Sequence, residues 1–160
     1  MKKILTALLS VLLCLLTACS FFGAEKKSFA YPVTEFENRC VKICADGFET
    51  EGRLSSTKEQ MITLTLVSPE SVKDMKITHN ASEDKTEFLG LTYSANFLEN
   101  TGISEVFEAI KVMSDTENLT PDEAGYYGFT PTGKNFTVIT DESGAVCKIT
   151  LEGITVEFTQ

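Results

Sequence analysis

The sequence predicts an α+β fold that is mostly β: a curved antiparallel sheet (half-barrel) of about eight to ten strands with one amphipathic helix packed on it. Three observations support this prediction. Short runs of alternating apolar and polar residues, broken by turn residues, begin at residue 38. One segment, residues 103 to 113, repeats its apolar residues at helical spacing instead. Residues 136 to 159 read as three consecutive antiparallel strands. One sheet covered by one helix implies a single core.

The first hairpin is expected from residues 40–45 and 48–55. Between them stand Asp46 and Gly47, and an Asp-Gly pair favours a two-residue turn because glycine tolerates a positive φ. One face of the second strand is charged, which predicts that this face meets water. The charged side chains are Glu49, Glu51 and Arg53.

A central strand is expected from Met61 to Val67, because its apolar density favours burial. Pro69 ends it, since proline cannot donate a hydrogen bond to a strand ladder. Three apolar side chains share one face of this strand: Ile62, Leu64 and Leu66. Further strands are expected at residues 72–79 and 85–97.

The helix is expected from Ile103 to Met113, with Gly102 as a tolerable cap. Its apolar stripe consists of Ile103, Val106, Phe107, Ile110 and Met113. A second, very short helical turn is expected at residues 120–123, where Thr120 caps and Pro121 takes the first helical position.

The last third contains strands at residues 136–140, 145–152 and 154–159. The turn at residues 141–144 and the glycine at position 153 separate them. Alternation places Cys147, Ile149 and Leu151 on one face. It likewise places Ile154, Val156 and Phe158 on one face, and the two triplets are the expected core.

The amino-terminal region combines Lys2 and Lys3, an apolar run of 13 residues from Ile4 to Leu16, and Thr17-Ala18-Cys19. The run is shorter than the roughly 20 residues that span a bilayer, and it fits a signal peptide. This region resembles the lipobox signal of bacterial lipoproteins. The resemblance implies cleavage before Cys19, which becomes the mature amino terminus, and a diacylglycerol on its sulfur. The acyl chains would be of the palmitate kind. The alternative is an ordinary signal peptide in which Cys19 is incidental.

The sequence therefore predicts three regions: a signal peptide (1–18), a lipidated tether (19–37) and a single β-rich globular domain (38–160). Without Lys2 and Lys3 the chain has 12 basic and 23 acidic residues, a formal charge of −11. We expect no nucleic-acid partner, because phosphate binding needs a basic face. We expect attachment to the membrane through the lipid on Cys19, because no basic patch would hold anionic lipid. The expected location is the outer face of the cell membrane, or the outer membrane if the host is a diderm.

No catalytic constellation, metal site or cofactor motif is apparent, so we expect a protein that is not an enzyme and has no cofactor. The single histidine, His79, ends a predicted strand and is interpreted as a surface or capping residue. A zinc site formed by His79 with Cys40, Cys44 and Cys147 is disfavoured, because structural zinc sites have more closely paired ligands. Cys147 could form a disulfide with Cys40 or Cys44, or all three could remain reduced as small core residues.

The mature domain resembles the half-barrel of bacterial lipoprotein carriers and small lipoproteins of Gram-positive, clostridial-type bacteria, which also have a Leu-Val-Ser-Pro phrase, here residues 66–69. One hypothesis is therefore a non-catalytic module that binds a hydrophobic ligand such as a lipid. The candidate ligand-facing side chains are Ile62, Leu64, Leu66, Phe107, Ile110 and Met113. The same residues could instead fill a packed core. The alternative function is a structural or protein-interaction lipoprotein of the cell envelope, with the aromatic segment 126–129 exposed in a loop.

Overall fold

The computed structural model describes residues 30–45, 47–80, 84–94 and 102–159. Within them it contains one antiparallel sheet of 11 strands. The strands are β1 (Phe36–Ala45), β2 (Phe48–Ser56), β3 (Ile62–Ser68), β4 (Lys76–His79), β5 (Asp84–Phe88), β6 (Leu91–Ser94), β7 (Thr120–Asp122), β8 (Gly125–Phe129), β9 (Asn135–Thr140), β10 (Val146–Leu151) and β11 (Ile154–Thr159). The helix is α2 (Ile103–Met113), and two short 3₁₀ turns are η1 (Glu70–Val72) and η3 (Thr116–Asn118). The mostly β fold with one helix is thereby confirmed for these residues.

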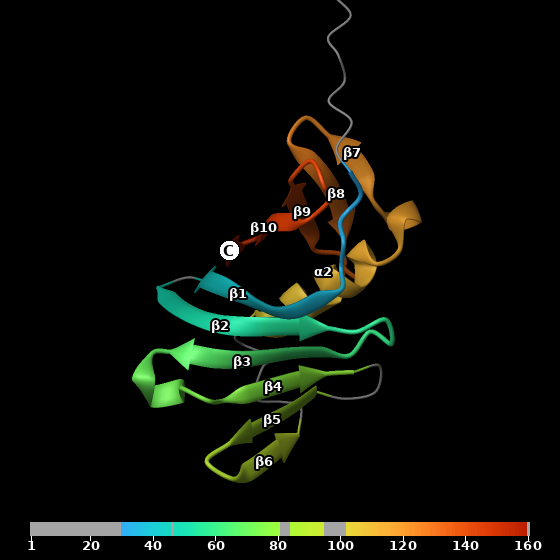
Figure 1. The fold of residues 1–160 in the computed structure, drawn as a ribbon. Helices are drawn as coiled ribbons and strands as arrows, with labels where there is room; N and C mark the ends of the chain where they lie inside the picture. The colour runs from blue at the N-terminus through green and yellow to red at the C-terminus, as the bar shows by residue number, and fades with distance from the viewer. Residues whose placement is uncertain (1–29, 46, 81–83, 95–101, 160) are drawn as a thin grey trace, which may run out of the picture.

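The strands lie in the order β6-β5-β4-β3-β2-β1-β11-β10-β9-β8-β7. Each half of the chain forms a meander, and the two meanders join where β1 pairs with β11. The helix lies between them and on one face of the sheet, as Figure 1 shows. In the sequence α2 comes after β6 and before β7, and these two strands form the two edges of the open sheet.

The sheet has more strands than the eight to ten expected, for two local reasons. The run expected as one strand over residues 85–97 turns back at Leu89 and Gly90, both with positive φ, and forms the hairpin β5–β6. The helical turn expected at residues 120–123 is instead the edge strand β7, which pairs with β8. Pro121 is compatible with this strand because an edge leaves one row of backbone groups unpaired.

Several local predictions are confirmed. Ala45 pairs directly with Phe48, and Gly47 has a φ of 78°, as the two-residue hairpin requires. Helix α2 has the expected bounds, and its apolar stripe is buried.

The strand expected over residues 72–79 is shorter than predicted, since η1 precedes it and β4 begins only at Lys76.

The core lies between α2 and the face of the sheet that α2 covers. Its largest fully buried side chains come from all parts of the fold. They are Phe107, Phe136, Leu54, Ile62, Leu64, Ile77, Ile110, Met113, Ile149, Val138 and Val146. Residues 30–37, expected in the tether, contact the domain, since the backbone of Val33 donates to Gly144 O at 2.8 Å.

Candidate functional site

The six residues expected to face a hydrophobic ligand lie in the core and are at most 3 % exposed. Those of β3 lie on the face that packs toward α2, as their alternating burial shows. One small cavity touches two of the six, Ile62 and Ile110, and its volume is about 20 Å³. That is room for about one water molecule. In the described residues these side chains therefore act as packing, and this cavity cannot hold an acyl chain.

His79 is buried, at 7 % exposed, so its interpretation as a surface or capping residue is wrong. It lies at the end of β4, directly opposite Asp84 of β5. Its Nδ1 bonds Asp84 Oδ1, and its Nε2 lies 3.1 Å from Glu108 Oε1 of α2. This second approach is not aligned as a hydrogen bond. The imidazole thus lies between two carboxylates and joins the helix to strands β4 and β5.

This cluster does not have the geometry of a nucleophilic site. Ser104 Oγ donates to Asp84 Oδ2 at 3.3 Å, so the hydroxyl nearest the carboxylate bonds the acid and not the imidazole. A histidine base must reach the nucleophile itself. Glu108 also forms an ion pair with Lys111, whose Nζ lies 3.3 Å from Glu108 Oε1. The His79 ring packs on Phe107 with 5.6 Å between ring centroids. The arrangement holds α2 in place.

The three described cysteines are free thiols. Strand β11 lies between β1, which carries Cys40 and Cys44, and β10, which carries Cys147. Two strand spacings amount to about 9.6 Å, beyond the Cα separation of about 7 Å that a disulfide spans. The structure therefore does not bring these thiols together. Cys147 also does not share a face with Ile149 and Leu151, because a register shift between Val146 and Lys148 turns it outward.

The aromatic segment 126–129 is strand β8 and not a loop. Tyr126 is buried and stacks on Tyr31 with 5.1 Å between ring centroids. Burial raises the pKa of the Tyr126 hydroxyl, with a smaller contribution from Tyr31. Alternation turns Tyr127 and Phe129 to the other face, where their rings meet edge to face at 6.3 Å. Phe129 is 57 % exposed, and Ile139 of β9 is also exposed.

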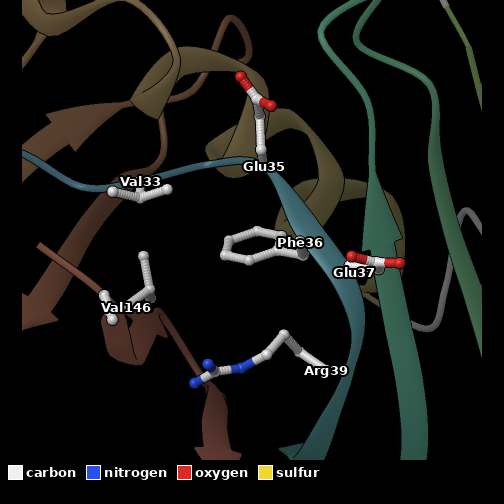
Figure 2. Close-up of a pocket in the computed structure, with 7 residues that line it drawn as sticks. Val33, Glu35, Phe36, Glu37, Arg39 and Val146 are labelled. Atoms are coloured by element: carbon white, nitrogen blue, oxygen red, sulfur yellow. The ribbon is translucent and has the colours of Figure 1, made fainter.

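A cavity of about 260 Å³ lies between the amino-terminal segment and the beginning of β10 (Figure 2). It is lined by Val33, Glu35, Phe36, Glu37, Arg39, Ala145 and Val146. The Nε of Arg39 is buried and has no protein acceptor. No sequence pattern pointed to this cavity, because it depends on where the chain before β1 meets the β9–β10 turn.

The turn beside this cavity is built around Asp141. Its Oδ1 accepts from Ser143 N, Ser143 Oγ and Ala145 N at 2.8, 2.7 and 2.9 Å. The Ser143 hydroxyl bond lowers the pKa of the Asp141 carboxyl most, and the charge of Arg39 adds a smaller effect. The turn then presents Gly144 to the backbone of Val33. This is the predicted turn at residues 141–144.

Cys19, and with it the expected lipid site, lies outside the described residues. No helix among the described residues is long and apolar enough to cross a bilayer. Those same residues contain no cluster of three or more histidine, cysteine, aspartate or glutamate side chains placed to hold a metal ion. Comparison with known protein families finds no matching family. A search of curated proteins finds no significant match either.

Proposed function

We propose that this chain is a non-catalytic exported lipoprotein, anchored through Cys19, that presents the outer face of its sheet to another protein of the cell envelope. The observation that carries the proposal is the packing of the inner face. Six side chains that could have lined a ligand chamber are at most 3 % exposed. With α2 filling that side, recognition is left to the surface that the helix does not cover.

The outer face offers an apolar patch at the β8–β9 end, which we call the outer patch: Tyr127, Phe129 and Ile139. Tyr127 pairs with Thr137 across the two strands, and Ile139 lies two residues further along β9. Diagonal neighbours of this kind are about 7–8 Å apart, so the three side chains form one surface. Aromatic residues on a rigid strand contribute strongly to protein interfaces, because they lose little conformational entropy on binding. Strand β8 is held between β7 and β9.

The anchor is proposed from the amino-terminal sequence, where Lys2, Lys3 and the apolar run precede Cys19. Two acyl chains give stable retention, whereas one is marginal. The anchored domain would lie on the outer face of the cell membrane, or on the outer membrane in a diderm host. Its half-barrel resemblance to lipoprotein carriers remains an alternative basis for function. The carrier alternative requires the interior to open, since the cavity at Ile62 and Ile110 is about 20 Å³.

The test is in-cell photo-crosslinking with the photoreactive group at position 129 of the full chain. A specific partner should crosslink from position 129 but not from position 89, because Leu89 is an even more exposed apolar residue that lies on the β5–β6 hairpin, toward the other end of the sheet. The crosslink should fall sharply when Ile139 is changed to serine, and also when Cys19 is changed to alanine. Equal yields from positions 129 and 89 would contradict a specific outer patch. A membrane-bound Cys19→Ala protein would contradict the anchor.

A further inference from the structure

We propose that the cavity between the amino-terminal segment and β10 binds a small aliphatic carboxylate, with Arg39 holding the carboxylate group. This cavity is separate from the outer patch. The proposal goes beyond the proposed function and does not depend on it.

The cavity lies where the chain before Cys40 separates from the strands next to it. Contacts between the two segments close the cavity at both of its ends. Val33 bridges Ala145, and its backbone N–H donates to Gly144 O. β1 pairs with β11 only from Cys40 onward, where Cys40 lies opposite Thr159. Between these two contacts the segment from residue 34 to residue 39 has β2 on one side and the cavity on the other.

The lack of an ion-pair partner distinguishes Arg39 from the lysines of the described chain. All eight lysines in the described part of the chain form ion pairs with carboxylates. In the same part of the chain neither Arg39 nor Arg53 has a carboxylate within ion-pair distance, although in the full sequence acidic residues outnumber basic ones by 23 to 14. Arg39 is also partly buried, and a buried donor without an acceptor is unfavourable. Arg39 acts on Asp141 only through its charge, and Asp141 Oδ1 already accepts three hydrogen bonds from its own turn.

Figure 2 shows how the side chains lie around the opening. Arg39 extends from β1 across the cavity toward the strand that carries Val146. The carboxylates of Glu35 and Glu37 turn away from it, and Glu35 lies 3.7 Å from Lys58. The guanidinium is therefore the charged group that faces the cavity.

The walls define the rest of the ligand. Val33, Phe36 and Val146 supply apolar surface next to the guanidinium. A guanidinium binds a carboxylate through two parallel N–H···O bonds, which an alcohol or an amine cannot reproduce. The volume of about 260 Å³ is below the roughly 300–1,000 Å³ of pockets for drug-sized ligands. These features together fit a carboxylate with a short aliphatic chain.

The test is nitrogen-15 NMR of the full chain in detergent micelles, titrated with sodium hexanoate and, separately, with hexan-1-ol. Hexanoate should shift the Arg39 Nε–H signal and the amides of Ala145 and Val146. Hexan-1-ol should leave the Arg39 Nε–H signal in place, because it lacks the charge. Equal shifts from the two probes would overturn the proposal, since the cavity would then recognise only apolar bulk.

Matched variants assign the effect to the cavity. Arg39→Gln should weaken hexanoate binding at least about tenfold, whereas Arg53→Gln should leave it unchanged. Ala145→Phe should also abolish binding by filling the cavity while Arg39 remains. Glu37→Gln, which leaves the walls in place, should tighten binding by about twofold through lost repulsion. Equal loss in Arg39→Gln and Arg53→Gln, or weaker binding in Glu37→Gln, would overturn the proposal.

Discussion

The two faces of the sheet differ in how many of their side chains are exposed to solvent. The inner face packs against α2 so closely that Leu64, Phe107 and Met113 are fully buried. The outer face, made from alternate residues of the same strands, exposes Phe129, two free thiols and ion pairs such as Lys148–Glu157. The difference indicates that the inner face stabilises the fold. It supports the proposals made above, which assign recognition to the outer face and to the opening beside β1.

The largest effect is expected for a substitution that compares the two faces directly. Phe107→Ala should lower the free energy of unfolding by about 3–5 kcal/mol, because it leaves a cavity in a closed core. Phe129→Ala should lower it by less than about 1 kcal/mol, since it loses only exposed area and one ring contact with Tyr127. Urea unfolding measures both. Similar losses in the two variants would show that the faces are not as different as their burial indicates.

A second prediction concerns the polar contact that joins α2 to strands β4 and β5. His79→Leu should cost about 1–3 kcal/mol, because it leaves Asp84 and Glu108 facing each other without the imidazole. Adding Glu108→Gln to His79→Leu should restore part of the loss by removing one of the two carboxylates. A double-mutant cycle from urea unfolding measures this coupling. Strict additivity of the two changes would contradict the cluster as described.

The sequence predicted α2 and the hairpins well because these depend on local spacing. The helical stripe from Ile103 to Met113 and the Gly47 turn are readable from a few neighbouring residues. Features that depend on contacts between distant segments were missed. His79 is buried only because α2 packs over the end of β4, and Cys147 faces outward because of a register shift that alternation cannot reveal. The Arg39 cavity likewise requires the chain before β1 to meet the β9–β10 turn.

A smaller effect is expected at the turn that frames this cavity. In the folded chain the hydrogen bond from Ser143 lowers the pKa of Asp141 below its ordinary value of 3.8. Its charged form therefore stabilises the fold above that value, and the contribution is lost as the pH falls through the folded pKa. Asp141→Asn should reduce stability at neutral pH, and the gap from wild type should narrow below about pH 3.8.

Urea unfolding at several pH values measures the gap. Glu142→Gln is the matched control, since Glu142 is an exposed neighbour in the same turn. A gap for Asp141→Asn that stays constant with pH would show that charge does not stabilise the turn.

The smallest effect is expected for the thiols of the outer face. Cys147→Ser should change the free energy of unfolding by less than about 0.5 kcal/mol, because Cys147 is exposed and free. Loss of a native disulfide would instead cost about 2–5 kcal/mol. Thiol titration of the unfolded, unreduced protein should find Cys40, Cys44 and Cys147 all reactive. Two missing thiols would show a bridge that the strand order disfavours.

Native mass spectrometry of the full protein released from membranes tests the central claim most directly, because one spectrum reads both the anchor and the interior. The account predicts a 142-residue chain that begins at Cys19 and carries covalent acyl chains. It also predicts that no lipid remains bound noncovalently under gentle conditions, because in the described residues the side chains between α2 and the sheet pack against one another. A stoichiometric, noncovalently bound lipid that is lost on unfolding would contradict the packed interior.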